Sequence, residues 1–93
     1  IMFANVGFFK ECVADLQIPD RWQDVSHGND ACPSFQINGY HIFIDHPNPK
    51  ARELEMPRYG VMRVDDVGQI TGETIADFER WDDLVQFVDP IVE

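Results

Sequence analysis

The clearest pattern of apolar and polar positions spans residues 33–46, where an Asn-Gly pair separates two runs of alternating residues. Asparagine and glycine both tolerate the positive φ angles of a type I′ turn, so the pair predicts a hairpin. We expect its strands over 34–38 and 40–46, in the register that a two-residue turn fixes. This register brings five apolar side chains to one face: Phe35, Ile37, Tyr40, Ile42 and Ile44.

Apolar residues at helical spacing predict an amphipathic helix over residues 4–17, which ends before Pro19. Its apolar positions are Val6, Phe9, Val13 and Leu16. A second helix is predicted over 81–89, because Asp82 and Asp83 suit the positive end of a helix dipole in its first turn. Its inward positions are Trp81, Leu84, Val85 and Val88.

Three shorter elements are predicted between the hairpin and the last helix. Asn48 before Pro49 is typical of an N-cap followed by a first helical proline, which predicts one helical turn within 49–55. A third strand is expected over 58–65. Residues 69–89 fit one long helix, but the β-favouring residues of 73–79 favour a fourth strand there.

Together these elements predict a single α+β domain over residues 1–93. Sequential strands joined by short turns form a four-stranded antiparallel meander of two hairpins, with both helices packed on one face. Ninety-three residues are enough for one hydrophobic core but not for two. Because Ile1 precedes Met2, we expect Met2 to be the natural first residue and Ile1 to lie outside the fold.

The second face of the predicted sheet is the candidate interaction surface. A sheet with one face in water alternates apolar and polar residues, yet the third strand is apolar on both faces. Either another subunit or partner covers this face, or the polar loop 19–32 folds over it in the monomer. The candidate partner or ligand residues are Trp22, Gln36, His41, Phe43, Asp45 and Met62.

The charge balance narrows the classes of partner. Seventeen acidic against seven basic residues give a net charge of −10, which disfavours direct binding to nucleic acids and to anionic membranes. A partner with a basic surface would be attracted by this negative charge. Four residues in two acidic pairs are candidates for steering such a partner toward the chain: Asp65, Asp66, Asp82 and Asp83. The basic residues Lys50, Arg52 and Arg58 form one local cluster, which could bind an anion or simply balance neighbouring acids.

Residues that could carry chemistry are present, but their spacing fits no known motif. The closest approach to a metal site would join His27, Asp30 and His46, and it needs a particular loop geometry. Cys32 falls opposite Asp45 in the hairpin register, which would raise the pKa of its thiol and weaken a nucleophile. We therefore expect no metal, no cofactor and no catalytic site, and we expect Cys12 and Cys32 to be reduced and buried.

These features favour a small cytoplasmic protein-binding module, such as an inhibitor, an immunity protein or an antitoxin-like accessory protein of bacteria or phages. We expect neither a signal peptide nor a membrane span, because no long apolar run is present. The main alternative is a homodimer that binds a small molecule in an aromatic-lined pocket, with linings from Trp22, Tyr40, Phe43, Tyr59 and Trp81. A mimic of DNA is a third possibility, but the acidic residues are scattered rather than arranged in rows.

Overall fold

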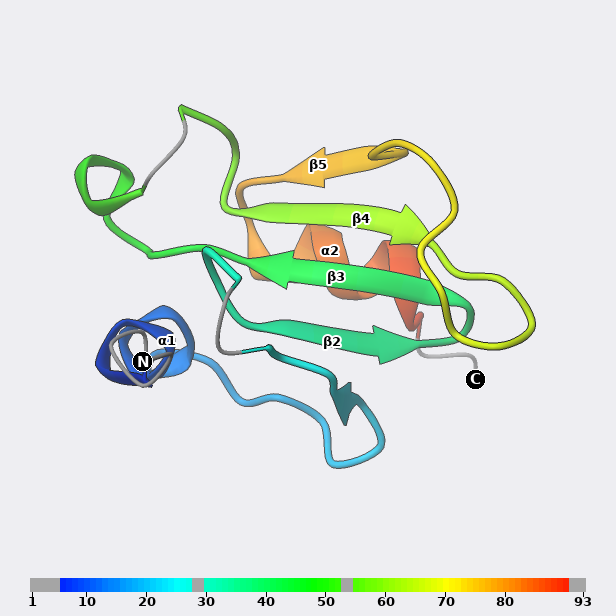
Figure 1. The fold of residues 1–93 in the computed structure, drawn as a ribbon. Helices are drawn as coiled ribbons and strands as arrows, with labels where there is room; N and C mark the ends of the chain where they lie inside the picture. Colours follow the sequence, from blue (N-terminus) through cyan, green and yellow to red (C-terminus); the bar gives the residue numbers. More distant parts are fainter. Residues whose placement is uncertain (1–5, 28–29, 53–54, 91–93) are drawn as a thin grey trace.

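The computed structural model describes residues 6–27, 30–52 and 55–90, which form a five-stranded sheet with one helix against it and a second at its end (Figure 1). Every neighbouring pair of strands is antiparallel, in the order β1-β2-β3-β4-β5. The elements are α1 (Val6–Val13), β1 (Gln23–Asp24), β2 (Ser34–Ile37), β3 (Tyr40–Ile44), the 3-10 helix η2 (Pro49–Ala51), β4 (Tyr59–Arg63), β5 (Ala76–Phe78) and α2 (Trp81–Val88). The predicted α+β class and the antiparallel meander are confirmed, but the predicted count of four strands is wrong.

The additional strand is β1, which lies within the predicted loop 19–32. It pairs with β2 through Gln23 opposite Gln36 and Asp24 opposite Phe35. Two exposed polar residues carry no alternation of apolar positions, so the sequence pattern gave no indication of this strand.

The predicted hairpin is confirmed in its turn and its register. Asn38 and Gly39 have φ angles of 52° and 82°, as a type I′ turn requires. Ile37 lies opposite Tyr40. Both strands are shorter than predicted, since β2 ends at Ile37 and β3 ends at Ile44.

The β4 and β5 strands are shorter than the predicted ranges 58–65 and 73–79. Strand β5 pairs with β4 through Tyr59 opposite Phe78, so the choice of a strand over one long helix is confirmed. Residues 64–75 form a long connection, in which Val64 and Ile70 make an isolated bridge.

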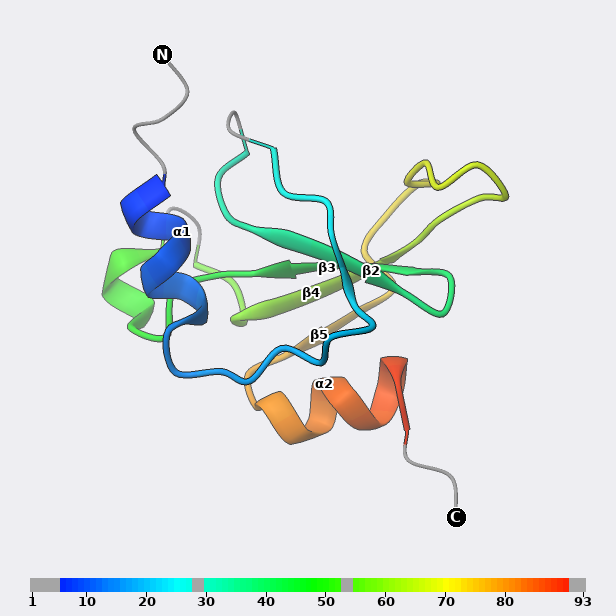
Figure 2. The ribbon, with the colours of Figure 1, turned by 90° about the horizontal axis from the view of Figure 1, so that it is seen from below.

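Helix α2 covers one face of the sheet, as the view from below in Figure 2 shows. Its predicted inward residues include Leu84 and Val88, which are 0% and 1% exposed. They belong to one buried cluster that also contains Trp22, Phe35, Ile42, Ile44, Tyr59 and Val61. Burial of this apolar surface is the main stabilising contribution to the fold.

Helix α1 does not share that face with α2, which corrects the predicted arrangement. It lies beyond the end of the sheet where β3 finishes and β4 begins (Figures 1 and 2). The buried guanidinium of Arg58 holds it there, because Nη2 donates to the Cys12 carbonyl at 2.8 Å and to Asp15 Oδ1 at 2.6 Å. The helix ends at Val13, four residues earlier than predicted.

The predicted helical turn after the hairpin is confirmed as a 3-10 helix of three residues. The Asn48 side chain accepts a hydrogen bond from the Lys50 amide at 3.0 Å, and Pro49 occupies the first helical position. Across the described part of the chain, no helix has the length and apolar character needed to cross a membrane.

Candidate binding surface

The face of the sheet opposite α2 has no helix against it among the described residues, and we call it the open face (Figure 2). Strand alternation and register place eight residues on it: Gln23, Ser34, Gln36, His41, Phe43, Gly60, Met62 and Asp77. Phe43 and Met62 are half-buried, so apolar surface is accessible near the centre of the face. In β4, Tyr59 and Val61 face α2 and Met62 lies on the open face, whereas Val64, which was expected beside Met62, lies outside the strand.

The connection between β4 and β5 reaches over one end of the open face. Gln36 Nε2 donates to the Gly68 carbonyl at 3.0 Å and to His41 Nδ1 at 3.0 Å. An amide nitrogen can only donate, so Nδ1 of His41 accepts and its ring proton lies on Nε2. Burial lowers the pKa of His41, which is 6% exposed, so this imidazole is neutral at pH 7.

A cavity of about 240 Å³ opens at the other end of the open face, and we call it the Gly60 cavity. Its lining residues come from both sheet strands and loops: Ala31, Cys32, Phe43, Asp45, Met56, Pro57, Arg58, Gly60, Thr74 and Asp77. Loop 55–58 and residues 31–32 form walls around a floor of β3 and β4.

Gly60, the second residue of β4, contributes no side chain to the floor of the cavity. Phe43 and Asp77 lie directly opposite Gly60 on the two neighbouring strands. A glycine within a strand often marks a site where another group approaches the backbone closely. Here the missing side chain leaves the space between Phe43 and Asp77 empty.

Two carboxylates give the Gly60 cavity a negative character. Asp77 is exposed, and no side chain pairs with it among the residues that the structure describes. Asp45 is half-buried, and its Oδ1 accepts a hydrogen bond from the His46 amide at 2.7 Å. Among the described residues that line the cavity, Arg58 is the one cation, and it is already paired with Asp15, so the charges of Asp45 and Asp77 are not balanced by it.

Both cysteines are buried and reduced in the structure. Burial, followed by the charge of Asp45, raises the pKa values of Cys12 and Cys32 to about 12 each. The effect of Asp45 on Cys32 is the one expected from the hairpin register. Both thiols are protonated at neutral pH, and a thiol is a poor nucleophile and a poor metal ligand.

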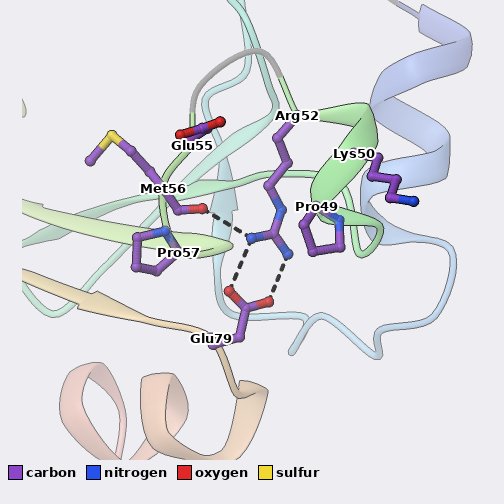
Figure 3. A pocket seen from close by; sticks show the side chains of 7 residues that line it. All are labelled: Pro49, Lys50, Arg52, Glu55, Met56, Pro57 and Glu79. Atoms are coloured by element: carbon purple, nitrogen blue, oxygen red, sulfur yellow. Dashed lines mark hydrogen bonds and ion pairs between the residues drawn. The ribbon is translucent and has the colours of Figure 1, made fainter.

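A larger hollow of about 490 Å³ lies beside η2, and two residues of the predicted basic cluster, Lys50 and Arg52, line it, whereas Arg58 lines the Gly60 cavity (Figure 3). Arg52 points into it but is held by Glu79 through two hydrogen bonds of 2.7 and 2.9 Å, and Nη1 also donates to the Met56 carbonyl. Lys50 points away from this pair in Figure 3. Arg52 and Arg58 therefore bind carboxylates of the chain itself, which leaves neither guanidinium to bind an external anion.

The predicted surface residues are only partly brought together. Gln36, Phe43 and Met62 lie on the open face and Asp45 lines its cavity, whereas His41 is covered. Trp22 lies in the core on the other face. Its Nε1 donates to the buried Asp89 carboxylate at 2.9 Å, and its ring packs on Trp81 with the two ring centroids 5.3 Å apart.

The aromatic residues that the sequence suggested as a pocket lining are divided between the two faces. Trp22, Tyr59 and Trp81 pack in the α2-facing core, and Tyr40 contacts Phe87 of α2. Phe43 lies on the open face. The acidic pairs are likewise separated, since Asp65 and Asp66 follow β4 and Asp82 and Asp83 lie on α2.

The histidines also lie apart. His46 bonds Glu11 and stacks on Phe8, while the backbone amide of His27 donates to Asp30. Within the described ranges, no three potential ligands gather into a site that could hold a metal ion.

No protein-family model, curated protein or solved structure matches this chain. The candidate site therefore rests on its own geometry. Of the ten lining residues, sequence reasoning identified only Phe43 and Asp45 as surface candidates. It missed Gly60, Asp77 and Met56 among others, because only the register of three strands and the path of loop 55–58 bring them together.

Proposed function

We propose that this chain is a small acidic protein-binding module of the cytoplasm, which associates with a partner that has a basic surface. Inhibitors, immunity proteins and antitoxin-like accessory proteins act in this way. The observation that carries the proposal is the open face, where the apolar Phe43 and Met62 adjoin the acidic Asp77 in a chain of net charge −10. Apolar anchors within an attractive field are the usual combination in rapidly forming complexes.

The two acidic pairs lie on different parts of the molecule, so they distinguish the open face from the α2 side as the binding surface. Asp66 belongs to the connection that bonds to Gln36 across the open face, whereas Asp83 is on α2. Met56, at the rim of the Gly60 cavity, is 45% exposed and adds apolar surface on the same side.

The proposal is tested with a partner captured from a lysate of the source organism at low and moderate salt. With that partner purified, we expect an association rate that falls steeply as ionic strength rises. Asp66→Lys and Asp83→Lys change the net charge equally, so they form a matched pair. Asp66→Lys should slow association about tenfold or more at low salt, and Asp83→Lys clearly less.

Two results would contradict the proposal. Association rates that do not depend on salt would contradict the proposed electrostatic attraction. Equal effects of the two variants would contradict the open face as the binding surface. Recovery of the bait alone, with twice the monomer mass in solution, would favour the homodimer.

A further inference from the structure

We infer that the Gly60 cavity receives one long aliphatic side chain that ends in a cation, such as a lysine of the partner. This inference rests on the proposed function and identifies the anchor residue of that interface. It follows from the volume of the cavity, the apolar character of its walls and the two carboxylates beside it.

The volume of the cavity suits a single side chain. Pockets for drug-sized ligands and cofactors commonly measure about 300–1,000 Å³, and this one measures about 240 Å³. Its opening on the sheet face makes it accessible to a residue that projects from a docked surface. A basic side chain on another protein therefore fits better than a free cofactor.

The walls match the two parts of a lysine side chain. The Phe43 ring, the Met56 thioether and Pro57 offer apolar contact to the methylene groups. Asp45 and Asp77, which come from the β3 end and from β5, offer carboxylates to the ammonium group. An ammonium group bonds acceptors in several directions, so carboxylates on separate strands suit it better than they suit a planar guanidinium.

The charge inside the cavity persists because the residues that the structure describes supply no free cation to it. The Arg58 guanidinium donates to the Asp45 main-chain carbonyl at 3.1 Å and to both oxygens of Asp15, not to the carboxylate of Asp45. Burial is the main cause of the raised pKa of Cys32 in the cavity wall, and the charge of Asp45 raises it further.

Gly60 provides a means to close the cavity without straining the backbone. Its φ angle is outside the left-handed region, and an added Cβ would meet Asp77 Oδ1 at 3.7 Å, an ordinary contact. Gly60→Val places a β-favouring side chain in the cavity. Gly7→Ala is the matched control, because a Cβ there meets nothing within 4 Å.

The experiment uses n-butylammonium as the probe and follows backbone amide NMR shifts of the ¹⁵N-labelled chain. We expect saturable shifts at Gly60, Thr74 and Asp77, with butyrate and n-butanol at equal concentration giving much smaller ones. Asp77→Asn, which changes an exposed side chain, should weaken binding about two- to fivefold. Gly60→Val should abolish saturation, and Gly7→Ala should leave it unchanged.

The inference fails if n-butylammonium shifts the amides near Asp82 and Asp83 as strongly as those of the cavity, which would indicate general screening. It also fails if a folded Gly60→Val protein, verified by its tryptophan fluorescence, binds the probe as the unmodified chain does. Neither result depends on the partner protein. The partner could bind with steep salt dependence while n-butylammonium causes no shifts at the cavity. This result would support the proposed function and contradict only the assignment of the cavity as the lysine site.

Discussion

Trp22 and Asp89 join three distant parts of the chain, because the Asp89 carboxylate accepts the indole N–H of Trp22 at 2.9 Å in the core. The same carboxylate accepts from Arg21 Nε at 3.1 Å and from the Asn38 side chain at 3.4 Å. It thereby ties the loop before β1 and the β2–β3 turn to the end of α2. A carboxylate that is 5% exposed is stable in the core only with such partners.

Asp89→Ala should lower the free energy of unfolding by about 2–3 kcal/mol, because the buried indole N–H loses its acceptor. Asp89→Asn keeps an acceptor oxygen and should lower it less. Urea unfolding followed by tryptophan fluorescence measures both, since Trp22 lies at the substituted site. Gln86→Ala, at an exposed position of α2, is the control and should change the value by less than about 0.5 kcal/mol. Equal stabilities of the three variants would contradict this role of Asp89.

Arg58→Lys should lower the free energy of unfolding by about 1–3 kcal/mol, although the charge is kept. A lysine cannot reach the Cys12 carbonyl, the Asp45 carbonyl and Asp15 together, as the guanidinium does. Because these contacts hold α1, amide hydrogen exchange should rise most in residues 6–13. Arg80→Lys is the control, since that side chain is exposed and makes no cap hydrogen bond. Unchanged exchange in α1 would show that other contacts hold the helix.

Sequence patterns correctly predicted the elements whose structure depends on residues close by in the sequence. The Asn38-Gly39 turn and the first-turn acids of α2 are such cases, and both agree with the structure. The position of α1 was predicted wrongly, because it depends on Arg58, 46 residues after Cys12, and amphipathic spacing does not specify which surface a helix covers.

The candidate site was less predictable than the fold for the same reason. Side chains alternate between the two faces along each strand, so counting from the Asn-Gly turn identified Gln36 and Phe43 as residues of one face. The Gly60 cavity requires the register of β3, β4 and β5 together, and a single glycine in a strand pattern does not reveal it. Trp22, alone in a polar loop, gave no indication of which face it would cover.

The stability of the chain should fall as the pH decreases from 7 to 5, owing to His41. The pKa of a histidine in an unfolded chain is about 6.5, and burial lowers the pKa of His41 in the folded chain, against the opposing charge of Asp30. The unfolded chain therefore binds the proton more readily. The contribution of neutral His41 is complete above about pH 7 and is lost as the pH falls through 6.5 toward the folded pKa, by up to about 1.4 kcal/mol per pH unit.

Urea unfolding at several pH values checks this dependence, and His41→Gln should reduce its slope between pH 7 and 5. Hydrogen bonds from Arg58 and Arg52 lower the pKa values of Asp15 and Glu79 from their ordinary values of 3.8 and 4.5. The stability that these carboxylates contribute is therefore lost mainly below those values, in more acidic solution than the window of His41. The difference between the two proteins isolates the contribution of His41. If the unfolding free energy of His41→Gln depends on pH as steeply as that of the unmodified chain, a group other than His41 causes the dependence.

Two serines that lie side by side should respond to alanine with opposite signs. Ser34 is 0% exposed, and its Oγ has no hydrogen-bond partner within the described residues. Ser26 Oγ accepts the Ser34 amide at 3.0 Å. Ser34→Ala should therefore raise the free energy of unfolding by about 1 kcal/mol, because a buried, unpaired hydroxyl is costly, and Ser26→Ala should lower it by a similar amount. A fall in both variants, measured by urea unfolding, would show that a buried water bonds Ser34 Oγ.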